Sequence, residues 1–201
     1  MDLYLEFCSS GDPRYREIRR NHYVADKGAI GMQAHFLIHF RNEIAGIISG
    51  GSSVYRVATR DKFFGITNAN RNNVLPGIVD NITFRLLNHE KNLGSMVLAL
   101  WEKTMPQVWK ELYGLQIFGF ETFVEGPRKG TVYRATNWQY CGSTKGRATP
   151  LNIFCKWAPG FSTPIETEYR SYWKIATPEE KALAKEKSKI RKALLGQRFA
   201  A

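Results

Sequence analysis

A carboxylate and a guanidinium flank a proline turn in the second half of the chain. The apolar run Leu115 to Val124 ends at Glu125, and Gly126-Pro127 separates this residue from Arg128. Proteins with α/β folds place reactive groups where a strand ends in a loop. Glu125 could therefore act as a general base and Arg128 could contact a substrate. The alternative is a surface ion pair between the two residues, which is common and carries no chemistry.

The stretch that follows combines amide, guanidinium and aromatic groups, from Tyr133 through Asn137 to Tyr140. Proteins recognise a nucleobase by stacking it on aromatic rings and by hydrogen bonds to its edge, so this composition suits a base. Core packing explains Trp138 and Tyr140 equally well, whereas Asn137 favours a polar site.

Histidines provide a further set of candidates. His22-Tyr23 ends the first predicted helix, where a histidine can transfer protons near neutral pH or simply complement the negative end of the helix dipole. His35 and His39 alternate onto one face of a predicted strand, but three scattered histidines are too weak a pattern for a ligand set. Whether a metal takes part is left open by the sequence.

The run Asn92-Leu93-Gly94-Ser95 precedes a predicted helix. Free backbone N–H groups at a helix start bind anions such as a pyrophosphate, and Gly94 would let a ligand approach. The alternative is an ordinary helix start, with Asn92 or Ser95 as its cap.

Several catalytic signatures are missing from the sequence. It contains no Walker loop, no GxGxxG, no zinc deaminase signature, no nucleophile elbow and no Asp-Pro-Pro-Tyr type motif of amino-methyltransferases. Cys8, Cys141 and Cys155 are widely separated and lack CxxC or CxxH spacing. Neither a disulfide framework nor a structural zinc site is therefore indicated.

Strands and helices alternate in a way that can position these groups. Strands are predicted at 3–7, 32–40, 44–51, 81–87 and 115–124, with two more near 138–140 and 151–157. A helix capped by Asp12 runs to Arg20, a second covers 96–103 until Pro106 interrupts or restarts it, and a short one covers 132–136. Residues 52–76 are expected to form an irregular insertion with one short helix. The pattern predicts an α/β (α+β) fold with a mixed central sheet and flanking helices.

The C-terminal segment has its own character. Thr177-Pro178-Glu179-Glu180 forms a capping box that opens a lysine-rich helix ending at Gly196. We therefore expect a catalytic domain at 1–176 and a basic C-terminal helix and tail at 177–201. This helix is either a solvated peripheral element or a contact to a DNA backbone.

Charge points to the class of partner. The chain has 201 residues and a formal net charge of +11, which favours a polyanion such as nucleic acid. No apolar run approaches the roughly 20 residues needed to span a bilayer, and the N-terminus lacks a signal-peptide layout. We expect a soluble cytoplasmic protein that binds double-stranded DNA and no membrane.

The order of these motifs resembles the Mom family, named for a phage Mu protein. The resemblance covers roughly residues 15 to 147 and is most specific in the stretch GTVYRATNWQYCGSTKGR from Gly130 to Arg147. The sequence is also similar to a related bacterial family of unknown function found near defence genes. Two features depart from the expected pattern: Glu125 stands where the Mom family usually has aspartate, and Asn92-Leu93-Gly94-Ser95 replaces the pyrophosphate loop of acetyltransferases.

The resemblance implies a fold of the GNAT acetyltransferase type and modification of the exocyclic amine of adenine in phage DNA, which protects that DNA from host restriction. It implies a site that contains Arg85, Glu125 and Tyr133. His22 joins these as a candidate catalytic residue, with Tyr23, Arg128 and Asn137 as candidate substrate contacts. Acetyl-CoA or another acyl-CoA is a candidate donor at residues 92–95.

Two other functions stay open. One is a DNA-binding or defence-related module in which the transferase fold has decayed, because the phosphate loop is degenerate. The other is an acetyl-CoA-dependent N-acetyltransferase that acts on a small amine or on a protein.

Overall fold

The computed structural model describes residues 2–22, 31–53, 56–145, 148–166 and 178–200. Within them, one eight-stranded sheet has the order β6-β7-β5-β4-β3-β2-β1-β8. The strands are β1 (Leu3–Cys8), β2 (Gln33–Phe40), β3 (Glu43–Ser52), β4 (Ile78–Leu86), β5 (Gly119–Glu125), β6 (Gln139–Ser143), β7 (Leu151–Trp157) and β8 (Arg198–Ala200). All neighbouring strands are antiparallel except β4 and β5, which are parallel. The predicted α/β class with a mixed sheet is confirmed.

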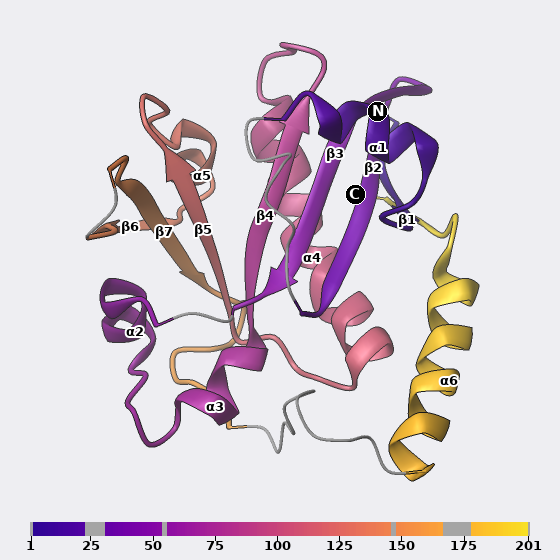
Figure 1. The fold of residues 1–201 in the computed structure, drawn as a ribbon. Helices are drawn as coiled ribbons and strands as arrows, with labels where there is room; N and C mark the ends of the chain where they lie inside the picture. Colours follow the sequence, from indigo (N-terminus) through magenta and orange to yellow (C-terminus); the bar gives the residue numbers. More distant parts are fainter. Residues whose placement is uncertain (1, 23–30, 54–55, 146–147, 167–177, 201) are drawn as a thin grey trace.

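The longest helix covers one face of this sheet. It is α4 (Leu93–Tyr113), which lies behind the strands in Figure 1 and buries Trp101, Met105 and Trp109 in the main core. The helix comes so close to β3 that a Cβ added to Gly50 would lie 2.8 Å from Cε of Met105. The prediction that Pro106 interrupts this helix was wrong, because α4 continues through it. Burial of large side chains on both sides of the proline offsets the lost hydrogen bond.

Two helices cover parts of the opposite face. Helix α1 (Pro13–Arg20) packs Tyr15 against Leu37 and Ile47, and Asp12 caps it as predicted, with Oδ1 accepting a hydrogen bond from the Arg14 backbone N–H at 2.9 Å. Helix α2 (Ala58–Phe64) packs over the other end of the sheet, where Phe64 joins a second apolar cluster. Helix α1 thus lies over β2, β3 and β4, whereas α2 lies over β6 and β7 at one end of the strand order.

Several predicted boundaries were wrong. Residues 52–76 contain two short helices, α2 and α3 (Arg71–Val74), and they are followed by a 3-10 turn η1 (Leu75–Gly77), where the sequence predicted an irregular segment with one helix. Strand β4 starts three residues before the predicted position, and β5 starts only at Gly119. Where β4 and β5 begin depends on the hydrogen bonds between these two strands, and a local apolar pattern carries no information about that pairing.

Strands β4 and β5 diverge after a short region of contact. They pair only from Ile78–Asp80 to Gly119–Glu121, and Figure 1 shows them separating above this point. A short helix, α5 (Thr131–Ala135), follows β5. The divergence leaves space between two strand ends that side chains from α5 and the strands themselves can enter.

The C-terminal segment is attached to the edge of the sheet. Helix α6 (Pro178–Leu194) buries Leu194 in the main core, and β8 pairs antiparallel with β1. Strand β8 was not predicted, because three residues carry too little pattern. Among the described helices, none combines the length and apolar composition needed to cross a bilayer.

Candidate functional site

Four basic side chains gather where α1, β4 and β5 end. His22 follows α1, Arg85 lies near the end of β4, and Arg128 lies in the turn after β5 that contains the cis peptide bond Gly126–Pro127. The charges of Arg85, Arg128 and Arg19 all act on the His22 imidazole. We call Arg19, His22, Arg85 and Arg128 the cationic cluster. The tertiary structure thus brings together three residues that sequence reasoning selected separately.

His22 is electrically neutral at physiological pH. Burial, followed by the charges of the three arginines, lowers the pKa of His22 from 6.5 to about 4, and a hydrogen bond to the Phe84 backbone only partly opposes this. A group with so low a pKa accepts a proton weakly, and the catalytic role of His22 stays a prediction. The cluster is better suited to holding an anion, because an anion would relieve the repulsion among its positive charges.

Arg85 adds a second sign that an anion is expected here. Within the described residues, its Nε is shielded from solvent and has no hydrogen-bond partner. A shielded guanidinium N–H without an acceptor costs free energy that a bound oxygen atom would recover. Arg85 therefore presents an unused donor at the end of β4.

Glu125 ends β5, as predicted. Its backbone carbonyl accepts a hydrogen bond from the Arg128 N–H at 3.1 Å, which closes the turn between the two residues. The side chain is partly buried. The carboxylate and the cationic cluster therefore belong to the same end of the sheet.

Tyr133, a predicted catalytic residue, is a core residue between the diverging strands. Its hydroxyl donates a hydrogen bond to Oδ1 of Asn81 at 2.7 Å, and only 7% of the residue is exposed. Its ring stacks on Phe154 and contacts Trp138. This arrangement gives Tyr133 a structural role that links α5 to β4, and its catalytic role stays a prediction.

Asn137, a predicted substrate contact, is exposed and has a positive φ of 64° in the turn after α5. Asparagine tolerates this conformation better than most residues, which explains its presence without a ligand. Tyr23, the remaining predicted substrate contact, lies outside the described residues.

The loop before α4 makes contacts within the protein. Asn92 has a φ of 63° and no side-chain cap, and the Ser95 hydroxyl donates a hydrogen bond back to the Asn92 carbonyl at 2.9 Å. Leu93 is buried, and a Cβ added to Gly94 would lie 3.1 Å from Cγ2 of Val132. Gly94 thus serves the packing of α5 on α4. Asn92 is exposed and Gly94 and Ser95 are partly exposed, so an acyl-CoA site at residues 92–95 stays a prediction.

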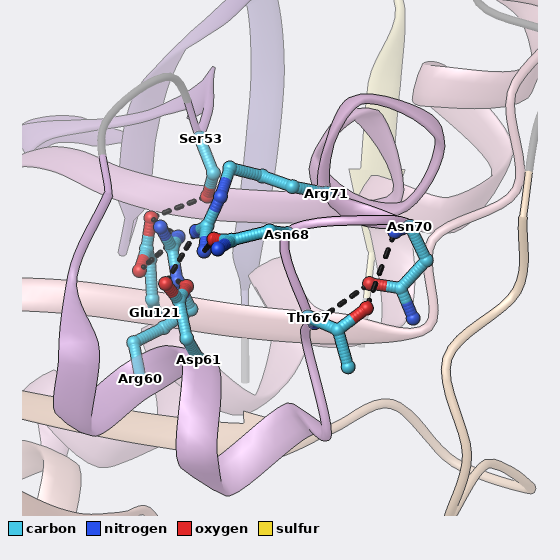
Figure 2. Close-up of polar contacts among 8 residues, drawn as sticks. All are labelled: Ser53, Arg60, Asp61, Thr67, Asn68, Asn70, Arg71 and Glu121. Carbon is cyan, nitrogen blue, oxygen red and sulfur yellow. Dashed lines mark hydrogen bonds and ion pairs between the residues drawn. The ribbon is translucent and has the colours of Figure 1, made fainter.

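A separate buried ionic network lies near the start of β5 (Figure 2). Nη1 of Arg60 donates to both carboxylate oxygens of Glu121, each at 2.8 Å. Nε of Arg60 donates to Asp61, also at 2.8 Å. Ser53 donates to Glu121, and Arg71 donates to Asp61. The network fastens the inserted helices α2 and α3 to the sheet.

Sequence reasoning missed this network, although Glu121 alternates with apolar residues along a predicted strand. Asp80 is the register partner of Glu121 on β4, and burial and the charge of Glu121 raise the pKa of Asp80 well above its ordinary value. Burial thus disfavours the charged form of Asp80. The only sequence signal was a charged residue at an inward strand position, and this does not identify its partner.

The histidines on β2 lie apart from each other. Nδ1 of His35 is within hydrogen-bond distance of Tyr15 and Ser49, whereas Nε2 of His39 lies 2.8 Å from Glu6. Within the part of the chain that the structure describes, no group of three histidine, cysteine or acidic residues could hold a metal ion.

The sheet order and the divergence of β4 and β5 define a fold of the GNAT acetyltransferase class, and known structures agree. An aminoglycoside acetyltransferase AAC(6')-Ib bound to coenzyme A and kanamycin is 12% identical with a TM-score of 0.50, over 78% of this chain and 95% of that one. The same enzyme with paromomycin and acetyl-CoA has a TM-score of 0.50 and 12% identity, over 78% of this chain and 94% of that one. A GNAT protein from Desulfovibrio desulfuricans is 10% identical with a TM-score of 0.49, over 78% of this chain and 99% of that one. At these identities the likeness shows the fold alone.

The sequence also matches a model of a protein family. The model of the Druantia protein DruA family matches residues 9–194, so the chain belongs to the DruA family. This family is not the Mom family that the sequence resembles. None of the curated proteins matches this sequence.

Proposed function

We propose that this DruA-family chain binds double-stranded DNA in a defence system and holds a backbone phosphate at the cationic cluster. Druantia is a defence system, which supplies the context. The observation that carries the proposal is the meeting of Arg19, Arg85 and Arg128 around a neutral His22, together with the unused Nε of Arg85. Guanidinium groups bind phosphate oxygens strongly, because their N–H groups match the geometry of the anion.

The overall charge supports the same partner. The formal net charge of +11 raises the local concentration of a polyanion around the protein. Helix α6 adds the exposed lysines Lys185, Lys189 and Lys192. A long duplex can contact more than one of these basic regions at once.

The test is fluorescence anisotropy with a labelled duplex at several salt concentrations. Arg85→Ala and Arg128→Ala should each weaken binding for all duplex sequences and reduce the salt slope by about 1, since each removes one phosphate contact. Lys103→Ala, which removes an exposed charge from α4, is the matched control and should change little. Equal effects of all three variants would exclude a phosphate site at the cluster.

A second candidate is transfer of a small group to a base amine, as the resemblance to Mom implies. The observation that favours it is the position of Glu125, which shares a turn with Arg128 at the end of β5. In this reaction Glu125 or His22 takes the proton from the base amine. An acyl-CoA at residues 92–95 stays a candidate donor, and no donor is assigned.

Nucleoside mass spectrometry of plasmid DNA from expressing cells tests this second candidate. A heavier nucleoside that disappears with Glu125→Ala, while DNA affinity stays nearly unchanged, is the expected result. Unmodified DNA from well-expressed protein that still binds duplex would leave only the DNA-binding function.

A further inference from the structure

A small cavity lies beside the cationic cluster, between α1 and the ends of β3 and β4. Its volume is about 310 Å³, at the lower end of the ~300–1,000 Å³ range typical of ligand pockets. Helix α1 contributes Arg14, Glu17 and Ile18, and Asn21 follows as its C-cap; the four are spaced by three or four residues. The sheet contributes Ile44, Arg85 and Leu87.

The lining has an apolar part and a polar part. Ile18, Ile44 and Leu87 are apolar, and Leu87 is 46% exposed. Glu17 and Asn21 supply a carboxylate and a carboxamide one helical turn apart. Within the described residues neither of these side chains has a hydrogen-bond partner. The cavity therefore offers apolar contact area and a polar edge whose groups are available to a ligand.

Arg14 lines the cavity, but its guanidinium is not available to bind a ligand. Its guanidinium is already engaged by Glu6 at 2.7 Å and by Asp12 at 2.8 Å. Arg85 is different, because it belongs both to this cavity and to the cationic cluster. A ligand that fills the cavity can thus be continuous with an anion held at the cluster.

The cavity suits the uncharged part of a nucleotide. A phosphate is disfavoured, because the Glu17 carboxylate would repel it, whereas the cluster next to it holds positive charge only. A nucleobase has apolar faces that fit among Ile18, Ile44 and Leu87, and a polar edge that can meet Glu17 and Asn21. A base paired within a duplex cannot reach this cavity, so the base must be unpaired or flipped out.

We propose that this cavity binds a nucleobase that carries an exocyclic amine, a proposal that rests on the DNA-binding function above. The Glu17 carboxylate accepts a hydrogen bond from the amine, and the Asn21 carboxamide both donates and accepts at the neighbouring positions of the base. Thymine presents a carbonyl where cytosine has its amine. The carboxylate cannot accept a hydrogen bond from that carbonyl and repels it, so thymine is excluded.

The test compares binding of oligo(dC) and oligo(dT) of equal length at slightly alkaline pH, by fluorescence anisotropy. The two strands have the same charge and similar stacking, but they differ in the group at C4. The wild-type protein should bind oligo(dC) about tenfold more tightly, as expected for one good base contact. Glu17→Gln should reduce this preference towards unity and raise oligo(dT) affinity, because it removes the carboxylate that repels the thymine carbonyl. Asn21→Leu should reduce the preference by weakening oligo(dC) binding.

Glu43→Gln is the matched control, because it neutralises an exposed carboxylate outside the cavity lining. It should change affinity for both strands equally and keep the preference. Binding of both strands with equal affinity, unaltered by Glu17→Gln, would overturn the base cavity and leave the DNA-binding proposal standing. Absence of binding to any strand or duplex would overturn the DNA-binding proposal, and the base cavity with it.

Discussion

The Tyr133 hydroxyl donates a hydrogen bond to Oδ1 of Asn81 across the divergence of β4 and β5. Both residues are buried, and the Asn81 Nδ2 in turn donates to the Ser49 carbonyl on β3. The opening between the parallel strands is therefore closed by a hydrogen-bonded chain that joins α5, β4 and β3.

Tyr133→Phe should lower the free energy of unfolding by about 1–3 kcal/mol, because it leaves a buried carboxamide oxygen without its donor. DNA affinity and any base modification should persist at wild-type levels once the protein is folded. Urea denaturation and anisotropy on the same sample measure both quantities. A stable variant that has lost modification would instead support the catalytic role that the resemblance implies for Tyr133.

Stability should fall as the pH is lowered from about 6.5 to about 4. The pKa of His22 and that of His35 are both lowered from 6.5 to about 4 in the folded protein, mainly by burial. The unfolded chain therefore binds protons in this window that the folded chain does not, so acid favours unfolding. Denaturation midpoints at a series of pH values check this.

His22→Asn should remove part of that pH dependence, and His35→Asn, in the buried polar cluster with Tyr15, should remove another part. A bound phosphate at the cationic cluster should also raise the pKa of His22, because its negative charge stabilises the imidazolium. NMR titration of the imidazole with and without duplex DNA measures this shift. An unchanged pKa in the complex would place the phosphate elsewhere.

Glu121→Ala should destabilise the protein by about 3–5 kcal/mol, because it leaves the fully buried Arg60 without its main partner. Glu121→Gln retains hydrogen-bonding capacity and should cost less. Thermal unfolding ranks the two variants. Similar melting temperatures for both would mean that the charge of Glu121 contributes little to fastening α2 and α3.

Gly94→Ala tests whether the loop before α4 is a packing element. Alanine favours a helix over glycine by up to about 1 kcal/mol, but here the new methyl group meets Cγ2 of Val132 at 3.1 Å. We expect no gain in stability in the wild-type background and a gain when Val132→Ala is also present. A double-mutant cycle by urea denaturation measures this coupling, and additive effects would contradict the packing explanation.

The sequence by itself determined several local elements and the strand end at which Glu125 lies. Alternating apolar residues marked β2, and a glycine-broken apolar run marked β3. Asp12 and Pro13 marked the start of α1, and the end of an apolar run marked Glu125. These features depend on neighbours within a few residues, which is why they can be read without a structure. The +11 charge likewise depends on composition alone.

Only the tertiary structure decided which residues meet. Arg85, His22 and Arg128 are far apart in the chain, and parallel pairing of β4 with β5 together with the docking of α1 brings their charges to one place. The same folding buries Tyr133 and fills the space at Gly94 with Val132. Burial and long-range contacts arise from packing of whole elements, so no local pattern separates a polar residue in the core from one that meets a ligand.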